Sequence, residues 1–255
     1  MDYKFAMKTA ILAGEIMLKN GAETHRVEDT MCYILRKSNA EAVEANVTMT
    51  GLVATIEVPD SNPITVIRRV QKRGTNLNRI MEVNNISRQY CEGNISLEDA
   101  YDRLKHISGK QYGVFVYNIA TVLTPIGFAL LFGGGIKETI ASAIAGLVLA
   151  VIMTIGKKLS MKSFILNMLS SCGIAITAML IKMIWPGVDQ NIVIISGIMP
   201  LVPGVAITNA IRDTLEENYI SGAARILEAF VIASAVALGA GVGMAFMGMF
   251  LTGGV

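Results

Sequence analysis

Apolar and polar positions follow two different patterns along the chain. Up to residue 111 they alternate with the short periods of half-buried helices and strands, whereas long uncharged apolar runs dominate the remainder. Each run is close to the ~20 residues that a helix needs to cross a bilayer. The pattern predicts an α-helical integral membrane protein with an N-terminal α+β domain. Five transmembrane helices are expected, at residues 114–132, 139–155, 163–185, 192–211 and 226–251.

The first 111 residues are numerous enough to form a domain with its own core. Gly51 is expected to divide a stretch rich in Val, Thr and Ile into two strands. Ser96 and Asp99 have the spacing of an acidic variant of the capping box. We place the boundary near 109–113, so that 1–111 form the α+β domain and 112–255 the transmembrane domain. Helices are expected at 2–19, 23–37, 76–91 and 97–107, and strands within 42–58 and 64–70.

Charge is distributed unevenly between the two parts, and this predicts an orientation. The first 112 residues hold 29 of the 42 charged residues. In the membrane part, the connections 156–162 and 212–225 carry five Lys and Arg, against Lys137 alone in the opposite loops. Since basic loops stay in the cytoplasm, the N-terminus should be cytoplasmic and the protein multi-pass in the cell membrane. Trp185 and Lys182 fit the opposite interface, as an aromatic anchor and a snorkelling cation.

Composition narrows the class of protein further. The chain is 53% hydrophobic with a mean hydropathy of +0.52, which is too apolar for an ordinary soluble domain. Its net charge of +2 gives no footprint for nucleic acid. Cys32, Cys91 and Cys172 show neither zinc spacing nor a disulfide pattern, which fits a reducing compartment. Glu15 interrupts the first apolar run, so no secretory signal peptide is expected.

The fourth apolar run contains the most unusual local chemistry. Pro200, Pro203 and Gly204 lie in its middle, and a proline lacks the N–H that a helix interior requires. Such a break persists in hydrocarbon only where protein or water satisfies the freed carbonyls, and transporters use breaks of this kind to build sites. The alternative is a structural kink packed against neighbouring helices. The helix that restarts near Val205 would present free N–H groups and a positive dipole end, which suits a carboxylate.

Polar residues follow the break at once. Thr208, Asn209 and Arg212, together with the break itself, form the candidate substrate pathway. For Thr208 and Asn209 the alternative is hydrogen bonding between helices. Asp213 and Arg225 are candidates for gating, and Arg212 could gate entry as well. Arg212 or Asp213 could also pair with Arg225, and the alternative is an interfacial charge pair of little consequence.

Glu228 is the candidate for coupling transport to an ion gradient. It lies three residues into the last apolar run, where a desolvated carboxyl has a raised pKa and can carry a proton. Arg225, one turn earlier on the same face, is its expected partner. An interfacial placement of Glu228 remains an equal alternative.

Two patterns in the spans are interpreted as structural. Asn118, Thr121 and Pro125 share a face of the first span, where we favour a proline kink whose freed carbonyls bond threonine hydroxyls. Gly239, Gly241 and Gly243 superficially resemble a dinucleotide loop. No strand precedes them, so a close helix-packing face formed by Gly239 and Gly243 is expected instead.

Two polar clusters occur in the N-terminal domain. His25, Glu28 and Asp29 share one helix and could hold a metal or act as acid and base, but a solvated or interdomain polar face is preferred. The second cluster could bind anionic headgroups, gather an anionic substrate or be a plain solvated face. It consists of Arg68, Arg69, Lys72 and Arg73. No metal or cofactor is expected, and without an ATP-binding loop a secondary mechanism is preferred.

Three stretches of the chain resemble signature segments of one family. The first is Gly21-Ala-Glu-Thr-His-Arg-Val-Glu-Asp-Thr30, and the second is Arg68-Arg69…Arg73-Gly74-Thr-Asn-Leu77. The third is Pro200-Leu-Val-Pro-Gly-Val-Ala-Ile-Thr-Asn-Ala-Ile-Arg-Asp213, followed by Tyr219-Ile-Ser-Gly222 and Ala224-Arg225…Glu228-Ala229. In this order they are similar to the threonine/serine exporter (ThrE-like) family, which includes YjjP-type proteins. The resemblance covers nearly the whole chain.

The resemblance implies a cytoplasmic domain followed by membrane helices, and export of amino acids or of dicarboxylates such as succinate. Long members fuse a second membrane half, whereas this chain resembles the split form, whose partner is a small YjjB-like membrane subunit. We therefore predict a non-enzymatic subunit of a secondary exporter for small carboxylate-bearing metabolites, within a homo- or hetero-oligomer. Two other classes stay open: a membrane-anchored enzyme or sensor acting through 1–111, and a structural partner of another transporter.

Overall fold

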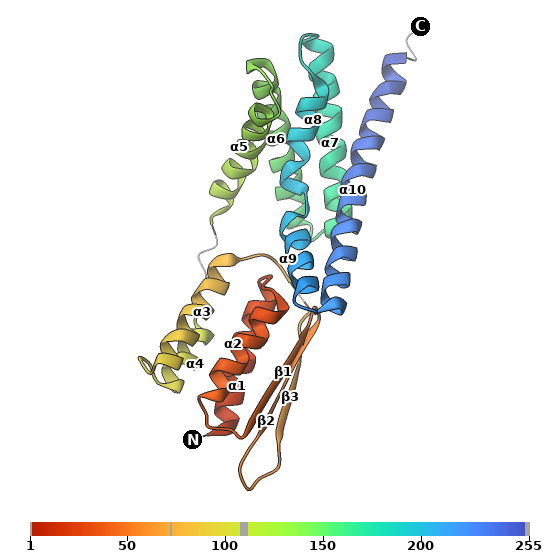
Figure 1. Cartoon of the computed structure of the whole chain (residues 1–255). Helices are drawn as coiled ribbons and strands as arrows, with labels where there is room; N and C mark the ends of the chain where they lie inside the picture. Colours follow the sequence, from red (N-terminus) through yellow and green to blue (C-terminus); the bar gives the residue numbers. More distant parts are fainter. Residues whose placement is uncertain (1, 72, 108–111, 253–255) are drawn as a thin grey trace. The chain divides into compact units, whose positions relative to one another are not determined.

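The computed structural model describes residues 2–71, 73–107 and 112–252 (Figure 1). Lys72 and part of the expected boundary at 109–113 lie outside these residues. The chain forms two compact units. The first combines Met1–Gln111 with Val205–Ile226, and the second combines Tyr112–Gly204 with Leu227–Val255. Part of the region expected to form the transmembrane domain therefore packs with the N-terminal residues.

The first unit contains the elements expected for the N-terminal domain, with bounds within two residues of those expected. Two later helices contribute to it as well. Its elements are α1 (Tyr3–Lys19), α2 (Thr24–Arg36), β1 (Ala42–Thr48), β2 (Gly51–Glu57), β3 (Ile64–Arg69), α3 (Leu77–Glu92), α4 (Leu97–Lys105), α9 (Gly204–Leu215) and the start of α10 (Tyr219–Thr252).

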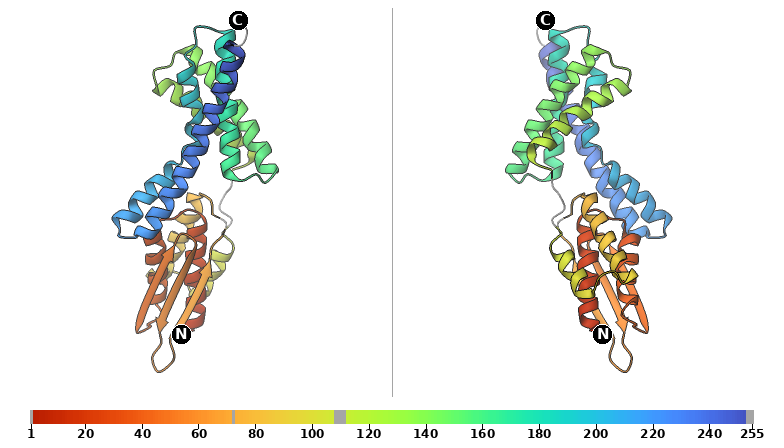
Figure 2. Two further views of the ribbon diagram at one scale, coloured as in Figure 1. Left: turned by 90° about the vertical axis from the view of Figure 1, so that its right-hand side faces the viewer. Right: turned by 90° about the vertical axis from the view of Figure 1, so that its left-hand side faces the viewer.

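The sheet of the first unit is a small antiparallel meander in the order β1-β2-β3. Figure 2 shows the strands from one side and the helices that cover them from the other. Gly14 allows α1 to approach α2 closely, since a Cβ there would lie 2.4 Å from Met31 Sδ. Every second residue of β2 is buried in this core, namely Leu52, Ala54 and Ile56.

Local caps fix the ends of α3 and α4. Ser96 Oγ accepts a hydrogen bond from the Asp99 N–H at 3.0 Å, which confirms the expected N-cap. The Asp99 carboxylate accepts from the Ser96 hydroxyl at 2.9 Å, which differs from the reciprocal backbone bond of a capping box. Asn76 caps α3 through Arg79 N–H, and Gly93 ends it with a φ of 84°, a conformation that favours glycine.

The second unit is helical throughout the residues that the structure describes. In those residues, four helices are long and apolar enough to cross a membrane, and the interrupted pair around the proline break provides a candidate fifth span. The protein is therefore mostly helical and multi-pass in the membrane. The elements of the second unit are α5 (Val114–Leu131), α6 (Ile136–Lys158), α7 (Ser163–Ile184), α8 (Gln190–Ile198), the 3₁₀ turn η1 (Met199–Leu201) and the remainder of α10.

Small residues bring the membrane helices into contact. A Cβ on Gly239 would lie 2.1 Å from the Met168 carbonyl oxygen of α7, and one on Gly243 would lie 2.7 Å from that of Cys172. This confirms the expected packing face, because helices in lipid associate through close backbone approach. The α6–α8 contact is polar, with Ser142 and Ser196 hydroxyls 2.9 Å apart. Buried alanines fill the rest of this core, namely Ala141, Ala145, Ala175 and Ala178.

Two expectations about the spans need correction. The last helix begins at Tyr219, so much of the expected connection 212–225 is helical and only a short turn, with Glu217 at a φ of 62°, joins α9 to α10. Around Pro125, the hydroxyl of Thr121 bonds the Tyr117 carbonyl at 2.9 Å. That of Thr124 bonds Ala120. These hydroxyls therefore bond carbonyls of the preceding turn, and not the Thr121 carbonyl that the proline leaves without its helical donor.

Candidate functional site

The prolines interrupt the fourth apolar run as expected. Helix α8 ends at Ile198, η1 carries Pro200, and α9 restarts at Gly204. Val202 is extended, with a ψ of 129°, because the residue before a proline is pushed out of helical geometry. Its N–H bonds the Met199 carbonyl at 3.2 Å, so the turn retains part of its own hydrogen bonding.

Helices α9 and α10 form a tight hairpin within the first unit. The Asn218 N–H bonds the Asp213 carbonyl at 2.8 Å and closes the turn between them. Gly222 permits the close approach of the two helices, since a Cβ there would lie 2.3 Å from Thr214 Oγ1 and 3.1 Å from the Ala210 carbonyl oxygen. The hairpin therefore presents one face of α9 and the first turns of α10 as a single surface.

A buried carboxylate, Asp213, joins this hairpin to the start of α2. Its Oδ1 accepts hydrogen bonds from Thr24, from the backbone N–H at 3.1 Å and from the hydroxyl at 2.9 Å. Its Oδ2 accepts from Arg225 Nε at 2.7 Å. The guanidinium also donates to the Ala22 carbonyl at 2.7 Å. Asp213 is 1% exposed and Arg225 6%, so the pair is shielded from water.

Two further side chains of α9 reach the same N-terminal loop. Asn209 donates its amide to the Gly21 carbonyl at 2.9 Å. Arg212 pairs with Glu23 at 2.5 Å, with more than half of its side chain exposed. The expected pathway residues Asn209 and Arg212 thus contact the loop 20–24, as do the expected gating residues Asp213 and Arg225. We name this set of contacts the loop–hairpin cluster.

The segment around Gly74 holds the other side of the loop. The Gly74 N–H bonds the Lys19 carbonyl at 2.9 Å, and the Asn76 N–H bonds the Asn20 carbonyl at 3.0 Å. Gly21 has a φ of 87°, and a Cβ on it would lie 3.0 Å from the Gly74 carbonyl oxygen. Glycine is therefore required at this position both for its backbone conformation and for space.

Glu28 adds a second half-buried carboxyl near the cluster. Burial raises the pKa of Glu28, while the hydrogen bond from the Val47 N–H at 2.7 Å opposes the rise. The charges of Asp29 and Asp213 also raise it. The same bond engages an N–H of strand β1, so Glu28 ties α2 to the sheet. Glu28 therefore has a structural role in joining α2 to β1.

The loop 20–24 brings together the three stretches singled out in the sequence, because it overlaps the first and residues 19–21 contact the second while the hairpin of the third contacts 21–24. A family model for threonine/serine exporters (ThrE) matches residues 8–247, a range that includes all three. The chain belongs to this family. The comparison with solved structures finds no match.

Curated ThrE relatives carry transporter names. The chain is 20% identical over 234 residues to the "Probable threonine/serine exporter" of Mycobacterium tuberculosis. It is 23% identical over 235 residues to the "Probable succinate transporter subunit YjjP" of Klebsiella aerogenes, and 22% over 250 residues to the "Threonine/serine exporter" of Corynebacterium glutamicum. These alignments cover 90%, 91% and 93% of this chain.

The relatives differ in how much of their own length is matched. The aligned region is 44% and 50% of the two threonine/serine exporters, so the chain spans about half their length. It is 90% of the YjjP subunit. The two exporters therefore contain about as much sequence again outside the aligned region.

The remaining candidates have exposed or half-exposed side chains. Thr208 is exposed on α9, and Glu228 is exposed on α10, three residues beyond Arg225. His25 Nε2 lies 3.3 Å from Asp29 Oδ2, and both side chains are about half exposed. Within the described residues, no group of three or more His, Cys, Asp or Glu is placed to hold a metal.

Two arginines of the basic cluster expected at residues 68–73 have different partners in the structure. Arg68 Nε lies 3.5 Å from Glu15, and Arg73 donates to Met49 Sδ at 3.2 Å. Sequence reasoning missed Thr24 and Glu23 as partners of α9. Their presence in a signature stretch was a usable signal, but only the fold shows which later residues they meet.

Proposed function

We propose that the chain is one subunit of a secondary exporter that moves small carboxylate-bearing metabolites out of the cytoplasm. Threonine and serine, or dicarboxylates such as succinate, are the proposed substrates. Membership of the ThrE family and the printed names of the relatives support the transport role. The observation that carries the proposal is the loop–hairpin cluster on the helix that directly follows the proline break in the chain.

The proposed pathway begins at the break. Pro200, Pro203 and Gly204 end one helix and start another. The Gly204 N–H bonds the Val202 carbonyl at 2.8 Å, and the N–H groups that follow it in the first turn of α9 have no acceptor within their own helix. Such N–H groups and the positive end of the helix dipole favour a carboxylate. Thr208 is exposed on the same helix and is a proposed hydrogen-bonding partner of the substrate.

Arg212 is the proposed entry residue. Its guanidinium pairs with the Glu23 carboxylate and remains more than half exposed. An incoming carboxylate has the same charge and shape as the Glu23 side chain and would compete with it for Arg212. Exchange of one carboxylate for the other would weaken the contact between α9 and the loop 20–24. Substrate entry would therefore weaken the binding of the loop 20–24 to the α9–α10 hairpin.

Asp213 and Arg225 are the proposed gate behind this entry. Their pair is buried and bonded to Thr24 and Ala22, so it sets how firmly the hairpin is held. Glu228 lies on the same helix as Arg225 and is the proposed carrier of a coupling proton. No chemical step on the substrate is proposed.

A second membrane subunit is part of the proposal. The chain covers nearly all of a relative named as a subunit but only half of two relatives named as exporters. We propose a small YjjB-like membrane protein as the partner, in a hetero-oligomer that can contain more than one copy of this chain. The N-terminal domain and the basic loops are proposed to lie in the cytoplasm.

Efflux from cells tests the proposed entry residue. Cells that express the chain with its partner are loaded with labelled serine, threonine or succinate, and the rate of loss is measured against internal concentration. Glu23→Gln removes the competing carboxylate and should lower the concentration for half-maximal efflux. Arg212→Gln should raise it by about tenfold, the effect of ~1.4 kcal/mol of lost binding. Equal values for both variants and the wild type would exclude this role.

The same assay tests the break. Pro203→Ala restores an N–H donor and helical freedom, and should slow efflux by about tenfold, the effect of ~1.4 kcal/mol on the barrier. Pro186→Ala lies in the turn after α7 and is the matched control, expected to leave the rate unchanged. Identical rates for Pro203→Ala and the control would show that the break has no part in transport.

A further inference from the structure

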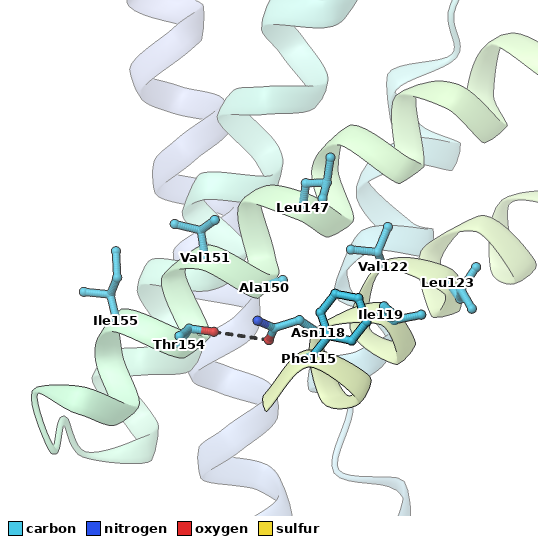
Figure 3. A pocket seen from close by; sticks show the side chains of 10 residues that line it. All are labelled: Phe115, Asn118, Ile119, Val122, Leu123, Leu147, Ala150, Val151, Thr154 and Ile155. Carbon is cyan, nitrogen blue, oxygen red and sulfur yellow. Dashed lines mark hydrogen bonds between the residues drawn. The ribbon is translucent and has the colours of Figure 1, made fainter. Parts of the chain in front are cut away.

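An apolar groove between α5 and α6 in the second unit has no role in the proposed transport cycle. Its volume is about 490 Å³ (Figure 3). Its walls are side chains more than two-fifths exposed, so water or lipid would meet them directly. They are Phe115, Ile119 and Leu123 of α5, and Leu147, Val151 and Ile155 of α6.

One end of this groove is closed and the other is polar. A Cβ on Gly146 would lie 3.0 Å from Val122 Cα and 3.3 Å from Pro125 Cγ, so α5 and α6 touch there. At the other end, the Thr154 hydroxyl donates to Asn118 Oδ1 at 3.2 Å, as Figure 3 shows. The walls are apolar between these two ends.

The amide of Asn118 favours an occupant with a hydrogen-bond acceptor. Its oxygen is engaged by Thr154, while its NH₂ group can donate two further hydrogen bonds. In hydrocarbon an unsatisfied donor is costly, since no water is present to accept from it. The ester carbonyl of a glycerolipid is an acceptor at the depth where the acyl chain begins.

A positioned cation lies at this polar end. Lys157 Nζ is 3.8 Å from the centroid of the Tyr117 ring, which fixes the ammonium beside the groove. From Lys157 to Leu147 the helix rises about 15 Å, at 1.5 Å per residue. That is about half of the ~30 Å hydrocarbon core of a bilayer, which is the depth of one leaflet. Lys158 adds a second positive charge at the same end.

We propose that this groove binds an anionic phospholipid. One acyl chain lies along the apolar walls, an ester carbonyl accepts from the Asn118 amide, and the phosphate pairs with Lys157. Apolar length, donor and cation occur in the order in which a phospholipid presents its chain, ester and phosphate. Binding is independent of the transport substrate and of the loop–hairpin cluster.

Native mass spectrometry of the full chain tests this site. The protein is purified from micelles that contain phosphatidylglycerol and phosphatidylcholine in equal amounts, and the bound lipid is counted. Wild type should retain phosphatidylglycerol preferentially. Lys157→Gln should reduce that retention about fivefold, the effect of one cation near an anionic headgroup. Lys137→Gln is the matched control, because Lys137 also lies over an aromatic ring, that of Trp185, at the opposite end of α6.

A second variant fills the groove without entering a helix contact. Val151 is 56% exposed, so Val151→Trp should displace the lipid and leave the melting temperature unchanged. Equal retention of both lipids, or retention that Lys157→Gln leaves at the wild-type level, would overturn the proposal. So would a Val151→Trp variant that keeps its lipid but no longer associates with the partner subunit, since a partner helix would then be the occupant.

Discussion

Asp213 is the residue on which the loop–hairpin cluster depends. Each of its oxygens serves a different segment, Oδ1 the start of α2 and Oδ2 the first turns of α10. A buried ion pair adds little net stability compared with apolar residues of the same size, but removing one partner leaves an unpaired buried charge. Removing one of Asp213 and Arg225 should therefore cost more stability than replacing both with apolar residues of similar size.

Neutralising Asp213 should destabilise the first unit strongly. Asp213→Asn leaves the buried Arg225 charge without a counter-ion, with an expected loss of about 3–5 kcal/mol in the free energy of unfolding. Arg212→Gln breaks an ion pair whose arginine is more than half exposed, and should cost less than ~1 kcal/mol. Denaturant melts of the full chain in detergent measure both. Similar losses for the two variants would contradict the burial of the Asp213–Arg225 pair.

Glu28 should make stability depend on pH. Because burial raises its pKa above the ordinary value of 4.5, the folded state holds the proton more tightly than the unfolded state. The wild type should therefore lose stability relative to Glu28→Gln as pH rises above 4.5 and through the raised pKa of the folded state. Glutamine keeps an oxygen for the Val47 N–H. Melting temperatures of both proteins between about pH 4 and about pH 8 test this linkage. A constant difference would show that Glu28 titrates normally.

Features that depend only on residues close together in the sequence were predictable. The Ser96 cap, the proline break and the Gly239–Gly243 packing face follow from spacing alone. The bonds of Asn209 to Gly21 and of Arg225 to Ala22 were not predictable, because these partners lie 188 and 203 residues earlier in the chain. The Asp213–Arg225 pair was one of the expected alternatives, whereas the bond from the Arg225 guanidinium to the Ala22 carbonyl was not expected.

At the scale of elements, glycine and proline decide where helices meet and where they stop. The last helix begins earlier than its apolar run suggests, since Gly222 lets a polar turn pack on α9. Apolar length identifies the part of a helix that lies in lipid, but it does not identify the polar part that continues beyond it. The N-terminal helices were predictable because their periodicity reflects one buried face each, and the strands because their stretches are rich in β-branched residues.

The α7–α10 contact should be sensitive to a single methyl group. Gly239→Ala places a Cβ 2.1 Å from the Met168 carbonyl oxygen, so the helices must separate. Gly241→Ala meets no atom within 4 Å, and should stabilise the helix by ~1 kcal/mol through its better helix propensity. Thermal melts in detergent should show opposite shifts for the two variants. Shifts of the same sign would contradict the packing of α10 on α7.

At the scale of the whole molecule, one polypeptide connects a mixed α/β domain to helices that can cross a membrane. The ThrE match extends over both, so the family is defined by their combination and not by the spans alone. The loop 20–24 holds a hairpin whose two helices continue directly into the break on one side and the last span on the other.

Counterflow in proteoliposomes tests the proposed transport role most directly. Vesicles are loaded with unlabelled serine, threonine or succinate, and uptake of the labelled compound is measured for the chain alone, the partner alone and the reconstituted pair. We expect rapid exchange of at least one carboxylate by the pair, and little by either subunit alone. In the pair, Asp213→Asn should abolish the exchange. No exchange by a correctly folded pair, or full exchange by the Asp213→Asn pair, would contradict the account.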